Sequence, residues 1–456
     1  MPRLTFQSLL RSADIGANSY CLELGQTRVL LDAGMHPKVE GTDSLPQFDE
    51  LRGLQVDAAI LTHGHLDHVG ALPVFQRQHP EAEVVMTEPT ADIAEAMLHN
   101  SVNVMQAKRQ EHDMKEYPFF LHPEIDRMQK AWALRKVGIP FALGAEGVRG
   151  TFYEAGHILG AAGVLLECEG TRIFYTGDVH FEDQTLLRGA AFPTEHVDIL
   201  IMETTRGATP RMAGYTRHGE MRRLAQAISE TLQGGGSVLM PVFALGKTQE
   251  MLLLLHEMHR SGLIPLHAPV QIGGLAVRMT QITDKFCDKV RRRHAGVRIL
   301  GLQDLVLSQP RNNARRTTCV PGRIYALSSG MMSENTASND FAFQFLDNPK
   351  NALLLVGYAD PDSPAGKILA AQPGDPIRLH RNHAPVTLKC RVEKFDFSGH
   401  APREALATYA ERLSPRKILL VHGDAASASW FQQALSSRLP QADITIPVPG
   451  EILPLE

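Results

Sequence analysis

The segment Asp57–Gly70 carries the strongest chemical signal in the sequence. It reads DAAILTHGHLDHVG, so an apolar run ends in a tight, glycine-containing loop that presents His63, His65, Asp67 and His68. Imidazole and carboxylate groups suit Zn²⁺, with Mn²⁺ or Fe²⁺ as alternatives. His63 and His65 are two residues apart, so they can converge on one ion. Asp67 and His68 lie further round the turn and can face a second ion. We prefer this metal-site interpretation to the alternative that these histidines are buried structural residues.

Four ligands do not complete two metal sites, so further residues are needed. Three candidates stand next to glycines, namely His157, Asp178 and His422. A single histidine or aspartate next to a glycine more often has a structural role than a metal-binding one. Their order along the chain after the HxHxDH motif makes them metal-ligand candidates.

That order of motifs resembles the metallo-β-lactamase superfamily over the whole chain. The segments are LDAG at 31–34, HxHxDH at 63–68, GHILGAA at 156–162 and TGD at 176–178. The resemblance implies an α/β protein with an αββα sandwich, and a hydrolase in which a hydroxide bridging two Zn²⁺ ions attacks the substrate. It implies that His63, His65 and His157 hold one ion. It also implies that Asp67, His68 and His422 hold the other, with Asp178 bridging the two.

Three further segments are similar to motifs of the β-CASP branch, whose members process nucleic acids. They are ILIMETTRG at 199–207, FSGHA at 397–401 and LVHGD at 420–424, with insert-like segments at 240–250 and 328–332 between them. The resemblance implies a parallel α/β β-CASP domain at 207–388, inserted between metallo-β-lactamase parts at 1–206 and 389–456. Thr204–Arg206 and Gly399 depart from the usual motifs, which puts substrate contacts there in doubt.

A histidine at position 422 is typical of RNA-directed members, whereas DNA-directed members generally lack it. The resemblance therefore favours a ribonuclease that cuts single-stranded RNA, preferably as an endonuclease, and leaves a 5′-phosphate and a 3′-hydroxyl. Asp67, Glu203 and His400 are the predicted catalytic residues, with Glu203 orienting His400 so that it donates a proton to the leaving oxygen. Substrate contacts are predicted at Ser329, Gly330, Met331 and Ser398.

Three alternatives remain open. A small-substrate hydrolase of thioesters or lactones would keep the metal ligands but would not need Glu203, His400 or the long insert. A DNA-directed exonuclease of the same superfamily is a second alternative. An inactive scaffold is the least favoured, because such partners typically lose metal ligands and this set is intact.

The secondary-structure elements that must position these residues show two different patterns along the chain. The first two hundred residues are short β-rich runs, such as 19–24 and 28–32, with helical segments between them. After Glu203 helices and strands alternate, with helices at 218–232, 249–259 and 275–286 and strands at 237–243 and 270–272, which is typical of a parallel sheet. A strand at 392–397, a helix at 402–413 and a strand at 417–422 follow. The apolar run Met251–Leu255 is interpreted as core, with a homodimer surface as the alternative.

Composition limits the partners. The formal net charge of -4 argues against general adhesion to nucleic acid, so any polyanion site must be local. Basic clusters at 289–293 and 311–316 are either a nucleic-acid patch or a charged helix end and loop. Gly246–Thr248 resembles a phosphate loop, but Pro241 replaces its first glycine, so no nucleotide triphosphate site is predicted.

Five widely spaced cysteines without a CxxC pair do not indicate a disulfide framework or a structural zinc. No run reaches the roughly 18 apolar residues of a membrane helix, and the N-terminus lacks the apolar core of a signal peptide. The sequence therefore predicts a cytoplasmic protein that does not enter the membrane.

Overall fold

The computed structural model describes residues 4–144, 147–265, 268–303, 305–307 and 318–456. The chain divides into two compact units. The first unit comprises residues 1–183, 187–211 and 400–456, and the second comprises 184–186 and 212–399. The basic cluster at 311–316 lies outside the described residues, and in the cluster at 289–293 Arg292 is buried. The domain boundaries expected from the sequence stay a prediction.

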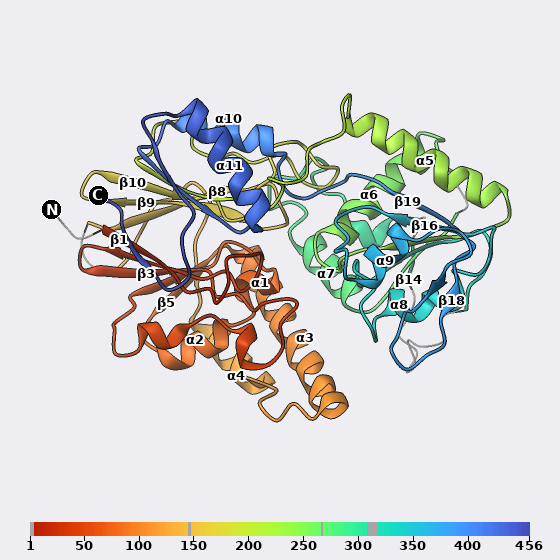
Figure 1. Ribbon diagram of the computed structural model, residues 1–456, viewed down its shortest axis with the longest axis horizontal. Helices are drawn as coiled ribbons and strands as arrows, with labels where there is room; N and C mark the ends of the chain where they lie inside the picture. The colour runs from red at the N-terminus through yellow and green to blue at the C-terminus, as the bar shows by residue number, and fades with distance from the viewer. Residues whose placement is uncertain (1–3, 145–146, 266–267, 304, 308–317) are drawn as a thin grey trace. The chain divides into compact units, whose positions relative to one another are not determined.

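Two seven-stranded sheets form the centre of the first unit, and Figure 1 shows helices on the outer face of each. One sheet has the order β22-β1-β2-β3-β4-β5-β6, with β1 Leu4–Ser8, β2 Tyr20–Leu24, β3 Thr27–Leu31, β4 Ala58–Ile60, β5 Glu83–Met86, β6 Ala133–Leu134 and β22 Ile452–Pro454. The other has the order β21-β20-β11-β10-β9-β8-β7, with β7 Phe141–Ala142, β8 Arg149–Glu154, β9 Ala162–Cys168, β10 Thr171–Tyr175, β11 Ile199–Glu203, β20 Lys417–Val421 and β21 Asp443–Thr445. The helices are α1 Leu66–Val69, α2 Leu72–Gln78, α3 Glu88–His112, α4 His122–Met128, α10 Arg403–Leu413 and α11 Ala425–Arg438.

Alternation of side chains along the strands builds the layers. In β10, Ile173 and Tyr175 enter the core between the two sheets. Phe174 points to the opposite face, where its ring lies 6.3 Å from that of Tyr409 on α10. Because successive strand residues face opposite sides, one strand serves both cores. The αββα arrangement expected from the sequence is therefore confirmed.

The second unit is built on a six-stranded sheet of parallel pairs, in the order β14-β13-β15-β12-β16-β19. Its strands are β12 Val238–Pro241, β13 Val270–Ile272, β14 Leu305–Leu307, β15 Ile324–Leu327, β16 Ala352–Leu355 and β19 Arg391–Lys394, and a small sheet pairs β17 Pro376–Ile377 with β18 Val386–Thr387. The helices are α5 Arg217–Gln233, α6 Lys247–Arg260, α7 Leu275–Lys285, α8 Ala337–Ala342 and α9 Pro364–Ala370.

The predicted elements after Glu203 are confirmed within a few residues by α5, β12, α6, β13 and α7. The apolar run Met251–Leu255 on α6 is fully buried, as the core interpretation predicted. The strand expected at 392–397 is β19, which pairs with β16 and so belongs to the sheet of the second unit.

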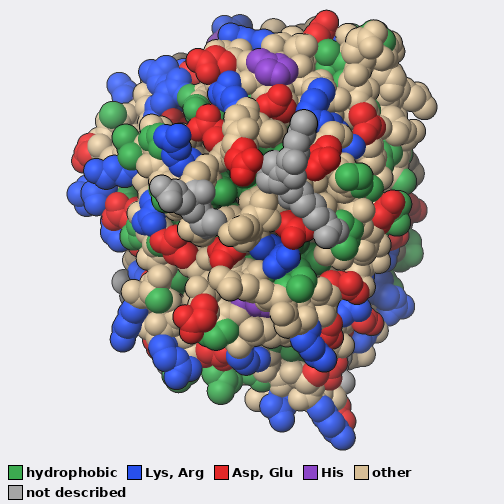
Figure 2. Space-filling model, turned by 90° about the vertical axis from the view of Figure 1, so that its left-hand side faces the viewer, with side chains coloured by type: hydrophobic (Ala, Val, Ile, Leu, Met, Phe, Trp, Pro, Cys, Tyr) green, Lys and Arg blue, Asp and Glu red, His purple; other side chains and the backbone are tan. Residues whose placement is uncertain are grey.

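The described residues contain no helix long and apolar enough to cross a membrane. Figure 2 shows acidic and basic side chains interspersed over the face that it presents. This mixture agrees with the small net charge of the sequence.

Candidate metal centre

The candidate site lies in the first unit, where several strands end. His63 and His65 follow β4, and the short helix α1 carries Asp67 and His68. Asp178 follows β10, Glu203 ends β11 and His422 follows β20. These three strands are adjacent and parallel, so their carboxyl ends meet at one edge of the sheet. The loop between β8 and β9 carries His157, and His400 precedes α10.

Gly177 shows why the turn before Asp178 needs a glycine. Its φ is +52°, in the left-handed region, and an added Cβ would lie 2.8 Å from Cβ of Thr62. A side chain at position 177 would therefore be strained and would collide with the strand that leads into the HxHxDH loop. The glycine lets the two sheets approach closely at the site.

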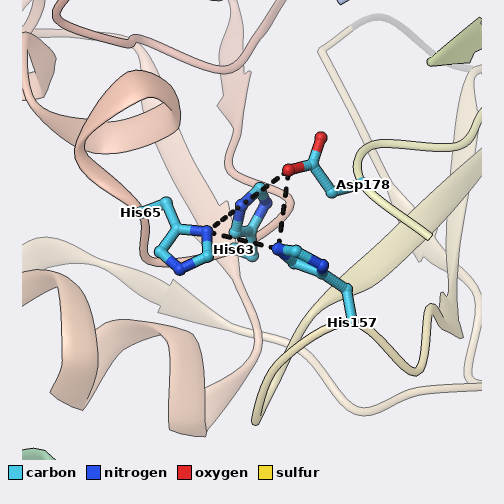
Figure 3. A group of neighbouring side chains, drawn as sticks. All are labelled: His63, His65, His157 and Asp178. Carbon is cyan, nitrogen blue, oxygen red and sulfur yellow. Dashed lines mark hydrogen bonds and ion pairs between the residues drawn. The ribbon is translucent and has the colours of Figure 1, made fainter. Parts of the chain in front are cut away.

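Four side chains form a first ligand group, shown in Figure 3. Nδ1 of His65 lies 3.1 Å from Nε2 of His63 and 3.2 Å from Nε2 of His157. Oδ2 of Asp178 lies 3.5 Å from Nε2 of both His63 and His157. Ligands about 2.0 to 2.2 Å from a tetrahedral metal lie roughly 3.3 to 3.6 Å apart, so separations of 3.1 to 3.5 Å are close to the spacing that one ion requires.

A second group faces the other oxygen of Asp178. Oδ1 of Asp178 lies 3.4 Å from Nε2 of His68 and 3.1 Å from Nδ1 of His422. Oδ2 of Asp67 lies 3.5 Å from Nε2 of His422 and 3.9 Å from Nε2 of His68. The two carboxylate oxygens of Asp178 therefore reach both groups, as a bridging ligand would.

Buried hydrogen bonds orient two of the imidazoles. Nδ1 of His68 donates to Oδ2 of Asp32 at 2.7 Å, which directs Nε2 toward Asp178. Asp32 is fully buried and also accepts from the Thr62 hydroxyl and, at 2.8 Å, from the Tyr175 hydroxyl. Because the Thr62 hydroxyl donates to Asp32, its oxygen is the acceptor for Nδ1 of His63 at 3.1 Å. Such partners fix the tautomer of a metal-binding imidazole.

The electrostatics of the site place four of the ligand candidates, His63, His65, Asp67 and Asp178, in the states that metals bind. Burial lowers the pKa of His63 and of His65, which keeps both imidazoles neutral. Burial raises the pKa of Asp178, but the neighbouring His422 and other imidazoles outweigh it and hold that pKa well below its usual range. Burial likewise opposes ionisation of Asp67, yet the hydrogen bond from His422 and the nearby imidazoles bring its pKa to about 2.

His68 lies between two carboxylates that favour a cation. Burial lowers its pKa, but Asp178 and Asp32 raise it well above the ordinary value. Oδ1 of Asp178 is buried and accepts no hydrogen bond from the described residues, and its nearest polar neighbours are the imidazole nitrogens of His422 and His68. Since a buried carboxylate oxygen without a hydrogen bond is costly, a metal ion between these groups would satisfy it. The donor set, the spacing and this oxygen all fit divalent metals.

A carboxylate and an imidazole border the ligand groups. Both carboxylate oxygens of Glu203 lie 3.2 Å from Nδ1 of His400. Glu203 is 1% exposed and also accepts from the amide of Val179 at 2.8 Å, so it is held rigidly. Nε2 of His400 lies 3.9 Å from Oδ2 of Asp178. Burial lowers the pKa of His400, but Glu203 and Asp178 outweigh it and raise the pKa to about 9.

The first unit thus brings together nine of the predicted site residues: His63, His65, Asp67, His68, His157, Asp178, Glu203, His400 and His422. The four predicted substrate contacts lie in the second unit. Ser329, Gly330 and Met331 follow β15, and Ser398 follows β19. The Ser329 hydroxyl accepts from the amide of Ser333 at 3.2 Å, so its present contact is within its own loop.

Comparison with known protein families follows the same division of the chain. Residues 13–220 match the metallo-beta-lactamase superfamily, residues 248–368 match the Beta-Casp domain, and residues 385–447 match the Zn-dependent metallo-hydrolase RNA specificity domain. The chain belongs to the β-CASP branch of the metallo-β-lactamase superfamily. The family expected from the motifs is confirmed, and membership implies binding of divalent metal.

Several curated proteins are similar to this β-CASP chain. It is 29% identical to "Endoribonuclease ysh1" of Schizosaccharomyces pombe, over 99% of this chain and 58% of that protein. It is also 29% identical to an "RNase J-like protein" of Methanocaldococcus jannaschii, over 97% of both chains. The chain therefore spans less than two thirds of the yeast relative. A solved structure from Enterococcus faecalis V583, of unknown function, superposes with a TM-score of 0.56 at 12% identity and covers 99% of this chain and 100% of its own, which shows the fold.

Sequence reasoning missed the residues that support the ligands. Asp32 was recognised only as part of an LDAG turn, whereas it anchors His68, and Tyr175 was not singled out. The sequence signal for Asp32 was its position as a polar residue at the end of an apolar strand, as in Val29–Asp32. Tyr175 carried no signal, because its partner lies 143 residues away in the sequence.

Proposed function

We propose that this β-CASP protein is a metal-dependent endoribonuclease that hydrolyses phosphodiester bonds of single-stranded RNA during RNA processing or decay. The observation that carries the proposal is the convergence of two ligand groups and the His400–Glu203 pair on one centre. The names of the yeast and archaeal relatives and the match to an RNA specificity domain support it.

The proposed metals are two Zn²⁺ ions, with Mn²⁺ or Fe²⁺ as alternatives. His63, His65 and His157 would hold one ion, Asp67, His68 and His422 would hold the other, and Asp178 would contact both. When bound, divalent ions polarise a phosphoryl oxygen and make water a nucleophile at neutral pH. The proposal rests on the spacing of these buried side chains and on the pKa shifts of His63 and Asp178, which favour the metal-binding forms.

The protein's own acid is His400. With a pKa raised to about 9, its imidazole is protonated at neutral pH and can give a proton to the departing 3′ oxygen. Glu203 keeps Nδ1 protonated and aims Nε2 toward the ligand groups. Asp67 stays ionised beside the second group, and its side chain is 21% exposed, so it can accept a hydrogen bond from the attacking water.

The segments 1–206 and 389–456 would carry the chemistry, and the insert 207–388 would contribute RNA contacts at Ser329, Gly330 and Met331, with Ser398 just beyond it. We propose a cytoplasmic enzyme that needs no nucleotide triphosphate, with a homodimer as an option that sedimentation can test.

The decisive experiment compares 5′-labelled and 3′-labelled copies of one single-stranded RNA. Internal products in both experiments, with new 5′-phosphates and 3′-hydroxyls, are expected for an endonuclease. Asp67→Asn should abolish cleavage because it removes a ligand charge. Asp49→Asn is the matched control, because Asp49 lies in the same unit with a side chain that is 76% exposed, and it should cleave like wild type.

Two results would contradict the proposal. Stepwise release of single nucleotides from one end would replace the endonuclease with an exonuclease. A zinc-loaded wild type that leaves RNA and single-stranded DNA intact but hydrolyses a thioester or lactone would establish the small-substrate alternative.

A further inference from the structure

Two aromatic side chains stand out on the second unit because they are exposed. Phe243 is 38% exposed and Tyr358 is 59% exposed, and no other aromatic side chain among the described residues is as open. Most aromatic residues of the chain are buried in cores, because exposing a large ring to water is unfavourable. Two open rings therefore call for an explanation.

Both rings lie at the same edge of the parallel sheet. Phe243 follows β12 by two residues and Tyr358 follows β16 by three. These strands are direct neighbours and parallel, with Val238 opposite Ala352 and Leu239 opposite Leu353. Adjacent strands are about 4.8 Å apart, so the chain delivers the two rings from neighbouring positions at the carboxyl edge. In parallel α/β sheets this edge is where ligands bind.

Local contacts hold each ring in place. A Cβ added to Gly330 would lie 3.0 Å from Cδ2 and Cε2 of Phe243, so that ring lies directly against the glycine that follows β15. The hydroxyl of Tyr358 donates to Oδ2 of Asp360 at 3.3 Å, and Asp360 is 6% exposed. Rings that are fixed before a ligand arrives lose little conformational entropy on binding.

The charge beside the rings suits a polyanion. Lys247 begins α6, four residues after Phe243, and a Cβ added to Gly357 would lie 3.8 Å from its Cε. Its ammonium donates to the carbonyl of Phe397, which keeps the side chain at this edge. A cation beside two open rings is the combination that single-stranded nucleic acid uses, because phosphates need positive charge and bases need flat apolar faces.

We propose that Phe243 and Tyr358 form an aromatic platform on which two unpaired bases of the RNA substrate stack. The inference rests on the proposed ribonuclease function and adds to it a base-binding surface on the second unit. Because every base has a flat face, the platform favours single strands over duplexes with little dependence on sequence. Gly330, predicted as a substrate contact, lies against the ring of Phe243.

The test measures RNA affinity by fluorescence anisotropy in the full chain carrying Asp67→Asn, so that bound RNA stays intact. The probes are a labelled single-stranded uridine dodecamer and the same strand with abasic positions. Phe243→Leu and Tyr358→Leu keep apolar bulk but lose the ring face, so each should weaken binding to the uridine strand roughly tenfold. Neither should change binding to the abasic strand.

Matched variants separate stacking from folding. Phe243→Tyr and Tyr358→Phe keep the ring and should bind RNA like the parent protein. Val320→Ala alters an apolar side chain that is 39% exposed at the opposite, amino end of β15, so it should have no effect. Thermal unfolding of each variant checks that the fold is intact.

The outcomes separate the platform from the function on which it rests. A wild type that cuts RNA, combined with leucine variants that bind the uridine strand as tightly as the parent, overturns the platform alone. Equal weakening for the uridine and abasic strands also overturns it, because contact with bases is then not the cause. A wild type that neither binds nor cuts RNA overturns the proposed function, and the platform with it.

Discussion

Replacing Glu203 by Gln tests the origin of acid catalysis at the metal centre. The change removes one negative charge and keeps the shape of a side chain that is 1% exposed. Both Glu203 oxygens lie 3.2 Å from Nδ1 of His400. Although burial lowers the pKa of His400, Glu203 is the largest cause that raises it to about 9. Without that charge the pKa should fall toward the ordinary value of about 6.5.

The size of the effect follows from the fraction of protonated imidazole. At pH 7 an imidazole of pKa about 9 is about 99% protonated, and one of pKa about 6.5 is about one quarter protonated. The acid form therefore falls about fourfold at pH 7 and about 77-fold at pH 8.5. Because the acid form is lost as pH rises, the variant should approach wild type below about pH 6.

The assay is the pH dependence of kcat/KM for a labelled single-stranded RNA between pH 6 and 10. Wild type should lose activity near pH 9, and Glu203→Gln should lose it more than one pH unit lower. His400→Ala removes the acid altogether and should cut kcat by roughly 10² to 10⁴. A Glu203→Gln profile that falls at the same pH as wild type, with metal content unchanged, would refute this account of His400.

Three further predictions concern support and stability. Asp32→Asn loses the charge that orients His68, so zinc affinity measured against a chromogenic chelator should fall roughly 10- to 100-fold, and an unchanged affinity would contradict that role. Asp424 caps α11 by accepting from the amide of Ser427 at 2.7 Å; Asp424→Ala should cost about 1 kcal/mol in urea unfolding, with zinc binding unaffected. Burial raises the pKa of Glu250, but an arginine and two amides outweigh it and lower the pKa. The ionised Glu250 carboxylate therefore stabilises the folded protein at pH values above its pKa in the unfolded chain. This stabilisation is lost as pH falls through its pKa in the folded protein. Glu250→Gln should show a weaker loss of stability than wild type between pH 6 and 3.

The sequence predicted the parts of the site that are local. The HxHxDH motif places four ligand candidates within six residues, so short-range geometry alone indicates a metal site. His157, Asp178 and His422 entered through the resemblance of motif order, because nothing in the sequence states that β4, β10 and β20 end at one place. The sheet order that brings them together is a property of the folded chain.

The parts that were missed depend on contacts between distant segments. The carboxylate of Asp32 receives the Tyr175 hydroxyl from another sheet, and sequence patterns do not encode such a partner. Phe243 lies in an apolar stretch whose sequence is typical of a buried core, yet its ring is exposed to solvent. The exposure of a side chain depends on which other segments of the folded unit cover it, and the local sequence does not contain this information. The strand expected to resume the first domain, β19, is instead the edge of the second sheet, since alternation of residues does not reveal which neighbour a strand pairs with.

Titration of metal-free protein with Zn²⁺, followed by cleavage of a labelled single-stranded RNA, tests the central claim most directly. The ligand groups around Asp178 predict that cleavage is absent without metal and reaches its maximum when two ions are bound per chain. Full cleavage by the metal-free protein, or none at two bound ions per chain, would contradict it.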